Sequence, residues 1–135
     1  MNIKKSILTL GAAGLTLTAL AAATAKLPPA ATKTGVTYAT DIKPIFEASC
    51  VKCHGAEKPK AKLRMDSLEA VLKGSKEGKI VKPGNSAESL LVKSVAHTTE
   101  DDEQWMPPLG NKAGIKKLTP EQIGLIRAWI DQGAK

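Results

Sequence analysis

Two cysteines and a histidine lie close together in the sequence CVKCHG, residues 50–55. Two thiols three positions apart can each add to one vinyl group of the same porphyrin, which forms two thioethers. A histidine directly after the second cysteine then lies beneath the ring, where its imidazole can bind the iron. The spacing therefore predicts one covalently attached haem c, held by Cys50 and Cys53, with His54 as an iron ligand.

The cysteine pair has a second interpretation. Outside the cytoplasm two cysteines usually form a disulfide, and C-x-x-C pairs form redox-active disulfides in thioredoxin-like βαβ units. No run of β-branched strand residues flanks residues 50–55. We therefore favour haem attachment.

A haem iron bound by one histidine has a sixth position to fill, and a thioether there raises the reduction potential. Three side chains are candidates: Met106, Met65 and His97. Met106 is favoured, because two following prolines stiffen its backbone and 52 residues separate it from His54, enough chain to pass around the ring. We expect Met65 to pack as an apolar side chain. His97 is expected to be exposed; as a ligand it would give a bis-histidine haem of lower potential.

Four weaker predictions concern the surroundings of the haem. Arg64 could pair with a propionate, or belong to a solvated basic loop. Trp105 could pack on the haem edge or donate its indole N–H to a propionate, or be a half-exposed surface residue. The acidic run 100–103 could bind calcium, but a solvated turn is favoured. The second ring nitrogen of His54 needs an acceptor, expected to be a backbone carbonyl in the loop Lys58–Leu63.

Two helices with apolar faces are predicted at the ends of the domain. The first spans residues 41–50, is capped by Thr40 or Asp41, and leads directly into the attachment motif. The last opens with Thr119 as cap, proline in the first turn and Gln122 completing a capping box. Its apolar arc is expected to pack on the apolar stripe of the first helix, which consists of Ile42, Ile45 and Phe46. Gly124 weakens the last helix without an apparent reason in the sequence.

Two further helices are predicted between them. One starts with Asp66 as cap and stops at Gly74, and the other starts at Asn85 or Ser86 and ends near His97. Loops are expected at residues 55–65, 74–84 and 97–118. The last of these is long for a compact domain, which is reasonable if it wraps a cofactor and carries a ligand.

The first 25 residues have the pattern of a signal peptide. Lys4 and Lys5 precede an uncharged apolar run at residues 7–23, and Ala-Thr-Ala at residues 23–25 provides a cleavage site after Ala25. The alternative is a retained membrane anchor, but 17 apolar residues are marginal for a span. Cleavage implies export to the periplasm. Residues 26–37 are predicted to be a flexible linker and residues 38–135 the folded domain.

Loss of the two signal-peptide lysines lowers the formal net charge from +7 to +5. A basic surface favours redox partner proteins with an acidic docking patch. Nucleic acid is not expected, because the lysines are scattered and no basic run is interleaved with aromatic residues. Membrane anchoring is not expected after cleavage. The chain has only four aromatic residues, Tyr38, Phe46, Trp105 and Trp129, so a haem would supply a large part of the apolar core.

The chain resembles class I, mono-haem c-type cytochromes, and among them the planctomycete-type cytochrome c domain. The resemblance covers about residues 38–134 and rests on motifs that occur in a fixed order. These are DIKPIF (41–46), CVKCHG (50–55), LRMD (63–66), PGNS (83–86) before SLL (89–91), MPP (106–108), and the closing segments LT (118–119) and AWIDQG (128–133).

The resemblance implies an all-α fold of four helices around one covalent haem, with the first and last helices crossing beside it. It implies thioethers at Cys50 and Cys53, His54 as proximal ligand, Met106 as distal ligand, and one-electron transfer. Two departures stand out. The family usually has an aliphatic residue where Met65 stands, and the domain often lies inside longer multidomain proteins.

These observations predict a periplasmic electron carrier rather than an enzyme. With both axial positions of the iron filled, no substrate reaches the metal. Two alternatives stay open. One is the electron-accepting subunit of a periplasmic dehydrogenase, and the other is a haem enzyme or sensor with a labile distal ligand.

Overall fold

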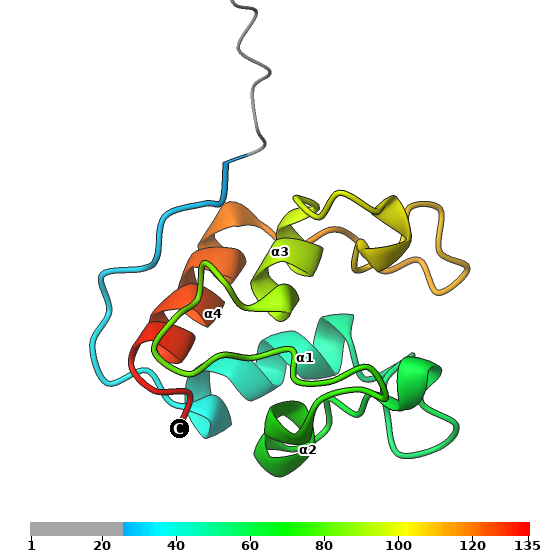
Figure 1. Cartoon of the computed structure of the whole chain (residues 1–135), viewed down its shortest axis with the longest axis horizontal. Coiled ribbons are helices and arrows are strands. Elements are labelled where there is room, and N and C mark those ends of the chain that lie inside the picture. Colours follow the sequence, from blue (N-terminus) through cyan, green and yellow to red (C-terminus); the bar gives the residue numbers. More distant parts are fainter. Residues whose placement is uncertain (1–25) are drawn as a thin grey trace, which may run out of the picture.

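The computed structural model describes residues 26–135, which form four α-helices and three short helical turns (Figure 1). The α-helices are α1 (Lys43–Ser49), α2 (Leu68–Lys73), α3 (Leu90–Ala96) and α4 (Pro120–Asp131), and the short turns are η1 (Tyr38–Ile42), η2 (Lys60–Lys62) and η3 (Asp102–Gln104). Within residues 26–135, extended pairing is limited to one bridge between Ser75 and Gly78. The predicted all-α class is confirmed for this part of the chain. The predicted signal peptide, residues 1–25, lies outside the described residues.

The first helical segment starts earlier than the sequence indicated. Thr37 is its cap, because its hydroxyl accepts a hydrogen bond from the backbone N–H of Thr40 at 3.4 Å. The predicted caps, Thr40 and Asp41, are therefore wrong. The added length is the π-helical turn η1, which closes with the N–H of Lys43 donating to the carbonyl of Tyr38 and continues directly into α1.

Helix α2 begins one residue later than predicted. The Ser67 hydroxyl accepts from the N–H of Ala70 at 3.2 Å, so Ser67 is the cap. The predicted cap, Asp66, instead binds the guanidinium of Arg64. The predicted end at Gly74 is confirmed. Its φ is +89°, and a Cβ there would lie 2.3 Å from a backbone carbonyl oxygen, so only glycine fits.

Helix α3 starts at Leu90, after the predicted caps Asn85 and Ser86. Ser86 has a different partner, because its N–H and its hydroxyl donate to the carboxylate of Asp131 in α4, at 2.7 and 2.9 Å. This contact ties the loop before α3 to α4. The predicted end near His97 is confirmed, since His97 is the C-cap of the helix.

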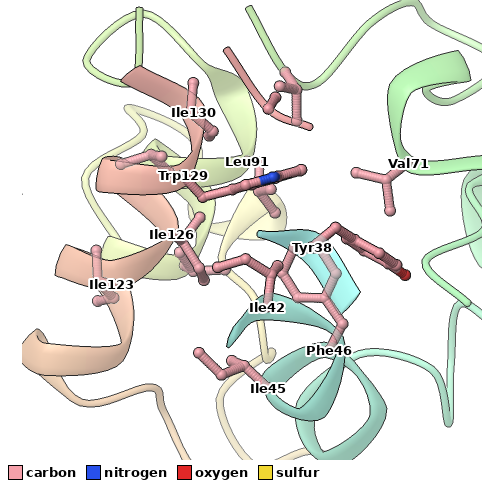
Figure 2. Packing of buried hydrophobic residues seen from close by; sticks show 14 of the residues in the cluster. Tyr38, Ile42, Ile45, Phe46, Val71, Leu91, Ile123, Ile126, Trp129 and Ile130 are labelled. Atoms are coloured by element: carbon pink, nitrogen blue, oxygen red, sulfur yellow. The ribbon is translucent and has the colours of Figure 1, made fainter. Parts of the chain in front are cut away.

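Helix α4 has the predicted capping box, in which Thr119 and Gln122 exchange hydrogen bonds at 3.2 and 2.9 Å. Its buried face packs on η1 and α3, and Trp129 also contacts Phe46 of α1 (Figure 2). Phe46 and Trp129, both fully buried, meet edge to face with their ring centroids 6.2 Å apart. This core supports the end of α1, where the attachment motif begins.

Residues 26–37 differ from the predicted flexible linker, because they pack along α4 (Figure 1). The N–H of Ala31 donates to the carbonyl of Gly124 at 2.9 Å, and the guanidinium of Arg127 donates to the carbonyl of Pro28. Near the end of the segment, Val36 is buried and its N–H donates to the side chain of Gln132 at 3.1 Å. The low-complexity composition concealed this packing, because most of the contacts use backbone groups.

This packing explains Gly124. A Cβ at that position would lie 2.7 Å from the carbonyl oxygen of Pro29. Glycine lets the N-terminal segment approach the backbone of α4, and this close approach outweighs the helix propensity that glycine loses.

Candidate haem-binding site

Cys50, Cys53, His54 and Met106 all line one cavity of about 370 Å³. Its other walls come from the loop before α2, from the loop between α2 and α3, from α3, and from the long loop between α3 and α4. The apolar residues in these walls are Leu63, Met65, Ile80, Leu90, Leu91, Val95, Pro107, Pro108, Ile115 and Leu118. The structure thus brings the attachment motif and the favoured distal ligand to the same apolar space.

The attachment motif is a tight turn that follows α1. The carbonyl of Cys50 accepts hydrogen bonds from the N–H groups of both Cys53 and His54, at 3.1 and 2.9 Å. Gly55 is required for this shape, because a Cβ there would lie 2.7 Å from the carbonyl oxygen of Val51. The compact backbone lets both cysteine side chains and the histidine reach the same cavity.

Both cysteines are free thiols. Burial is the main cause that raises the pKa of the Cys50 thiol to about 12, with the neighbouring Cys53 adding to it. Redox-active C-x-x-C sites have the opposite feature, a thiol whose pKa is lowered so that the thiolate can attack. The environment of Cys50 therefore does not match that of a disulfide oxidoreductase.

The ring of His54 is buried and oriented by two backbone carbonyls. Its Nδ1 lies 3.2 Å from the carbonyl oxygens of Lys60 and Leu63. Carbonyl oxygens only accept, so Nδ1 carries the proton and the Nε2 lone pair is left for a metal. Burial lowers the pKa of His54, which favours the neutral ring. The predicted acceptor in the loop Lys58–Leu63 is confirmed.

Met106 is placed by α3. Its N–H donates to the carbonyl of Ser94, in the last turn of α3, at 3.1 Å. A second sulfur also lines the cavity, since Met65 is almost fully buried in its wall. The N–H of Met65 donates to the carbonyl of His54 at 2.8 Å, so Met65 is tied to the attachment motif.

The sequence analysis missed Asn111, which also lines the cavity. Its side-chain amide donates to the carbonyls of Pro108 and Ile115, at 3.0 and 2.8 Å, and its oxygen accepts from the N–H of Ile115 at 2.9 Å. These bonds fold the loop so that Ile115 reaches the wall. Asparagine directly after Gly110 is a turn signal that could have indicated this role.

Two of the weaker site predictions are not supported by the geometry. Arg64 lies outside the cavity wall and makes a two-point contact with Asp66, at 3.0 and 2.6 Å. Trp105 also lies outside the wall, and its indole N–H donates to the carbonyl of Thr99 at 3.4 Å. Both side chains have partners within the chain, and their roles at a propionate stay predictions.

His97 differs from its expected exposure. Only 9% of its surface is exposed, and its ring stacks on Trp105 with the centroids 4.9 Å apart and the planes 12° apart. It lies outside the cavity wall that contains Met106.

The acidic run 100–103 is exposed, and Asp101 accepts from the N–H of Glu103 at 2.9 Å within the turn η3. Across residues 26–135, His, Cys, Asp and Glu form no group of three or more that could hold a metal ion. This agrees with a solvated turn.

One family of known proteins matches part of the chain. Residues 50–110 match the family model for planctomycete cytochrome c. This stretch is similar to planctomycete-type cytochrome c domains. A cytochrome c domain implies haem c with iron and haem-based electron transfer. The residues present fit that group, because two free thiols, an imidazole with an available nitrogen and a methionine surround an apolar cavity.

The chain is also similar to part of a solved structure. A chain of Kuenenia stuttgartiensis hydrazine synthase is similar with a TM-score of 0.50 and 25% sequence identity. The similarity covers 73% of this chain but 16% of that chain, so this protein spans a small part of the enzyme that it resembles. A search of the curated proteins found no match. None of the helices within residues 26–135 has the length and hydrophobicity needed to cross a membrane.

Proposed function

We propose that this protein is a periplasmic one-electron carrier with a single covalent haem c, whose iron is bound by His54 and Met106. One observation carries the proposal: Met106 lines the same cavity as the C-x-x-C-H residues, although 52 positions separate it from His54. When bound, the haem supplies an iron that cycles between the ferrous and ferric states.

The chain would hold the haem in three ways. Cys50 and Cys53 would form the thioethers from a single tight turn. His54 would bind the iron through Nε2, with its ring orientation held by two backbone carbonyls. The apolar wall would cover the ring and exclude water, and η1, α1 and α4 would support it from behind.

Filling both axial positions favours a carrier over a catalyst. If His54 and Met106 both bound the iron, no position would be left for a substrate, and the chain would need only to expose a haem edge to its partners. A thioether ligand also favours the ferrous state and raises the potential.

Export and charge define the partners that we propose. Cleavage after Ala25 would release the protein into the periplasm. Exposed lysines lie along the attachment loop at positions 52, 58, 60 and 62. They would attract redox partner proteins with an acidic docking patch, and no role in nucleic-acid binding is proposed.

A second candidate is a haem-bearing subunit that accepts electrons from a periplasmic enzyme. It is favoured by the similarity to part of a much longer hydrazine synthase chain. The two candidates share the same site chemistry. They differ in whether the purified protein stays alone or co-purifies with a larger enzyme.

Optical spectra of the exported holoprotein test the proposal. We expect a low-spin, six-coordinate haem in both redox states and no spectral shift when carbon monoxide is added to the ferrous protein. A high-spin ferric spectrum would contradict the carrier and favour a haem enzyme or a sensor with a labile distal ligand.

Variants assign the residues. Met106→Ala should lower the potential and admit carbon monoxide, whereas His97→Ala should leave a six-coordinate haem in place. If only His97→Ala opens the site, Met106 is not the ligand. Replacing Cys50 and Cys53 together with serine should let acid-acetone extract the haem, and retained haem would rule out attachment through these thiols.

A further inference from the structure

His97 occupies a costly position at the end of α3. Its backbone is left-handed, with φ 56° and ψ 46°, at a C-cap where glycine is the favoured residue. Its ring is buried, and its Nε2 has no hydrogen-bond partner among the described residues. Backbone strain and an unpartnered buried nitrogen both destabilise the folded state, and such costs tend to be retained where a side chain has a function.

Besides the backbone of Met106 and Pro107, which opposes the lowering of its pKa by burial, the ring of His97 has one aromatic contact. It stacks on Trp105, with the ring planes 12° apart and the centroids separated by 4.9 Å. Trp105 directly precedes Met106 in the chain. The stack therefore joins the end of α3 to the residue next to the methionine in the cavity wall.

The backbone makes the same connection. The carbonyl of Ser94 accepts hydrogen bonds from the N–H groups of both His97 and Met106, each at 3.1 Å. One carbonyl thus ends the helix and anchors the methionine. Residues 100–104 between them are exposed and mostly acidic, and Asp101, Glu103 and Gln104 line the cavity. The N–H of Thr98 donates to the carbonyl of Lys93 at 2.9 Å, so the closure combines this bond with the stack and the bond from Met106.

We propose that His97 and Trp105 are positioning residues for Met106. Their stack closes the loop 97–106 onto the end of α3 and keeps Met106 in the cavity wall. This inference rests on the proposed function, in which Met106 binds the haem iron. It assigns no contact between His97 and the haem.

His97→Gly is the decisive variant, because it removes the ring and supplies the residue that the left-handed backbone prefers. If His97 does not position Met106, the His97→Gly variant should be as stable as the unaltered protein or more stable, and the sulfur-to-iron charge-transfer band and the amide exchange of Met106 should not change. The positioning role predicts a weaker sulfur-to-iron charge-transfer band in the ferric holoprotein. It also predicts that the ferrous protein binds carbon monoxide and that the Met106 amide exchanges with deuterium faster. The rate of carbon monoxide binding and the rate of exchange of the Met106 amide should each rise about two- to tenfold, the range expected for the loss of an aromatic stack.

Matched variants separate the stack from other effects. His97→Phe keeps a ring and removes the unpartnered nitrogen, so it should retain the band. Trp105→Phe should likewise retain it, and Trp105→Leu should reproduce His97→Gly. If His97→Phe fails to fold, the Trp105 pair still tests the stack. Leu109→Ala, at a side chain 72% exposed in the same loop, is the control and should change nothing.

The outcomes distinguish failure of this inference from failure of the proposed function on which it rests. If the unaltered holoprotein lacks the charge-transfer band, Met106 is not a ligand and the proposed function fails. If the band is present but His97→Gly and Trp105→Leu both leave it and the Met106 exchange rate unchanged, the positioning role is wrong and the proposed function stands.

Discussion

On the His54 side of the cavity the chain is held mainly by backbone carbonyls, whereas on the Met106 side the backbone carbonyl of Ser94 is joined by side chains. The carbonyls of Lys60 and Leu63 orient the His54 ring, and that of Cys50 closes the attachment turn. On the Met106 side, the His97–Trp105 stack and the amide of Asn111 shape the loops around the methionine. A backbone carbonyl is present whatever the residue type. Substitutions near His54 should therefore change the attachment turn only when they disturb the core that supports it. Substitutions near Met106 should change the position of the loop by removing its own side-chain contacts.

The largest expected effect breaks the support of the His54 side. Phe46 is fully buried, and its carbonyl accepts from the N–H groups of Cys50 and Val51 at 2.8 and 3.0 Å. Phe46→Ala removes its ring from between Tyr38 and Trp129 and should lower the free energy of unfolding by about 3–5 kcal/mol. Urea denaturation measures this, with the exposed Glu47→Ala as control. A loss below about 1 kcal/mol would mean that the core does not anchor the turn.

A smaller effect is expected where the N-terminal segment packs on α4. Gly124→Ala places a Cβ 2.7 Å from the carbonyl oxygen of Pro29, which should cost about 1–3 kcal/mol of unfolding free energy. The same substitution in a chain lacking residues 26–33 should instead stabilise by up to about 1 kcal/mol, because alanine is the better helix former. The reversal of sign, measured by denaturation, is the test. Stabilisation in both chains would show that the segment does not pack there.

On the Met106 side, Asn111→Ala removes three side-chain hydrogen bonds and should cost about 1–2 kcal/mol. Amide exchange should accelerate in residues 108–118 and stay unchanged in residues 50–65. Asn85→Ala, at an exposed asparagine that accepts one bond from Glu88, is the matched control. If amide exchange accelerated equally in residues 108–118 and 50–65, the two sides of the cavity would not be held independently.

The smallest effect is expected at an exposed ion pair on the His54 side. The hydrogen bond from Arg64 lowers the pKa of Asp66 below its ordinary value of 3.8. A lowered carboxyl pKa stabilises the fold above that ordinary value, and the contribution disappears as pH falls through the lowered pKa. Arg64→Gln should thus raise the pKa of Asp66, which NMR titration measures. It should reduce the free energy of unfolding at a pH above the ordinary pKa of Asp66 and leave it unchanged at a pH below the lowered pKa. A changed haem spectrum would instead restore the predicted role of Arg64 at a propionate.

Local sequence signals predicted the elements whose contacts are local. The capping box of Thr119 and Gln122 joins residues three apart, so its pattern is visible in the sequence. Ser86 shows the opposite case. It has the chemistry of a helix cap, but the carboxylate of Asp131, 45 residues away, competes successfully for its hydroxyl and N–H. No local pattern reveals that competition.

The order of cysteines, histidine and methionine in the sequence by itself determined the chemistry of this protein, because residue type decides which atoms can bind a haem. The tertiary structure decided which of these residues share one cavity and how each is held. It buried His97 against Trp105 and used Gly124 to admit the N-terminal segment. Those outcomes depend on close packing between segments far apart in the chain, and a sequence pattern does not record distances between such segments.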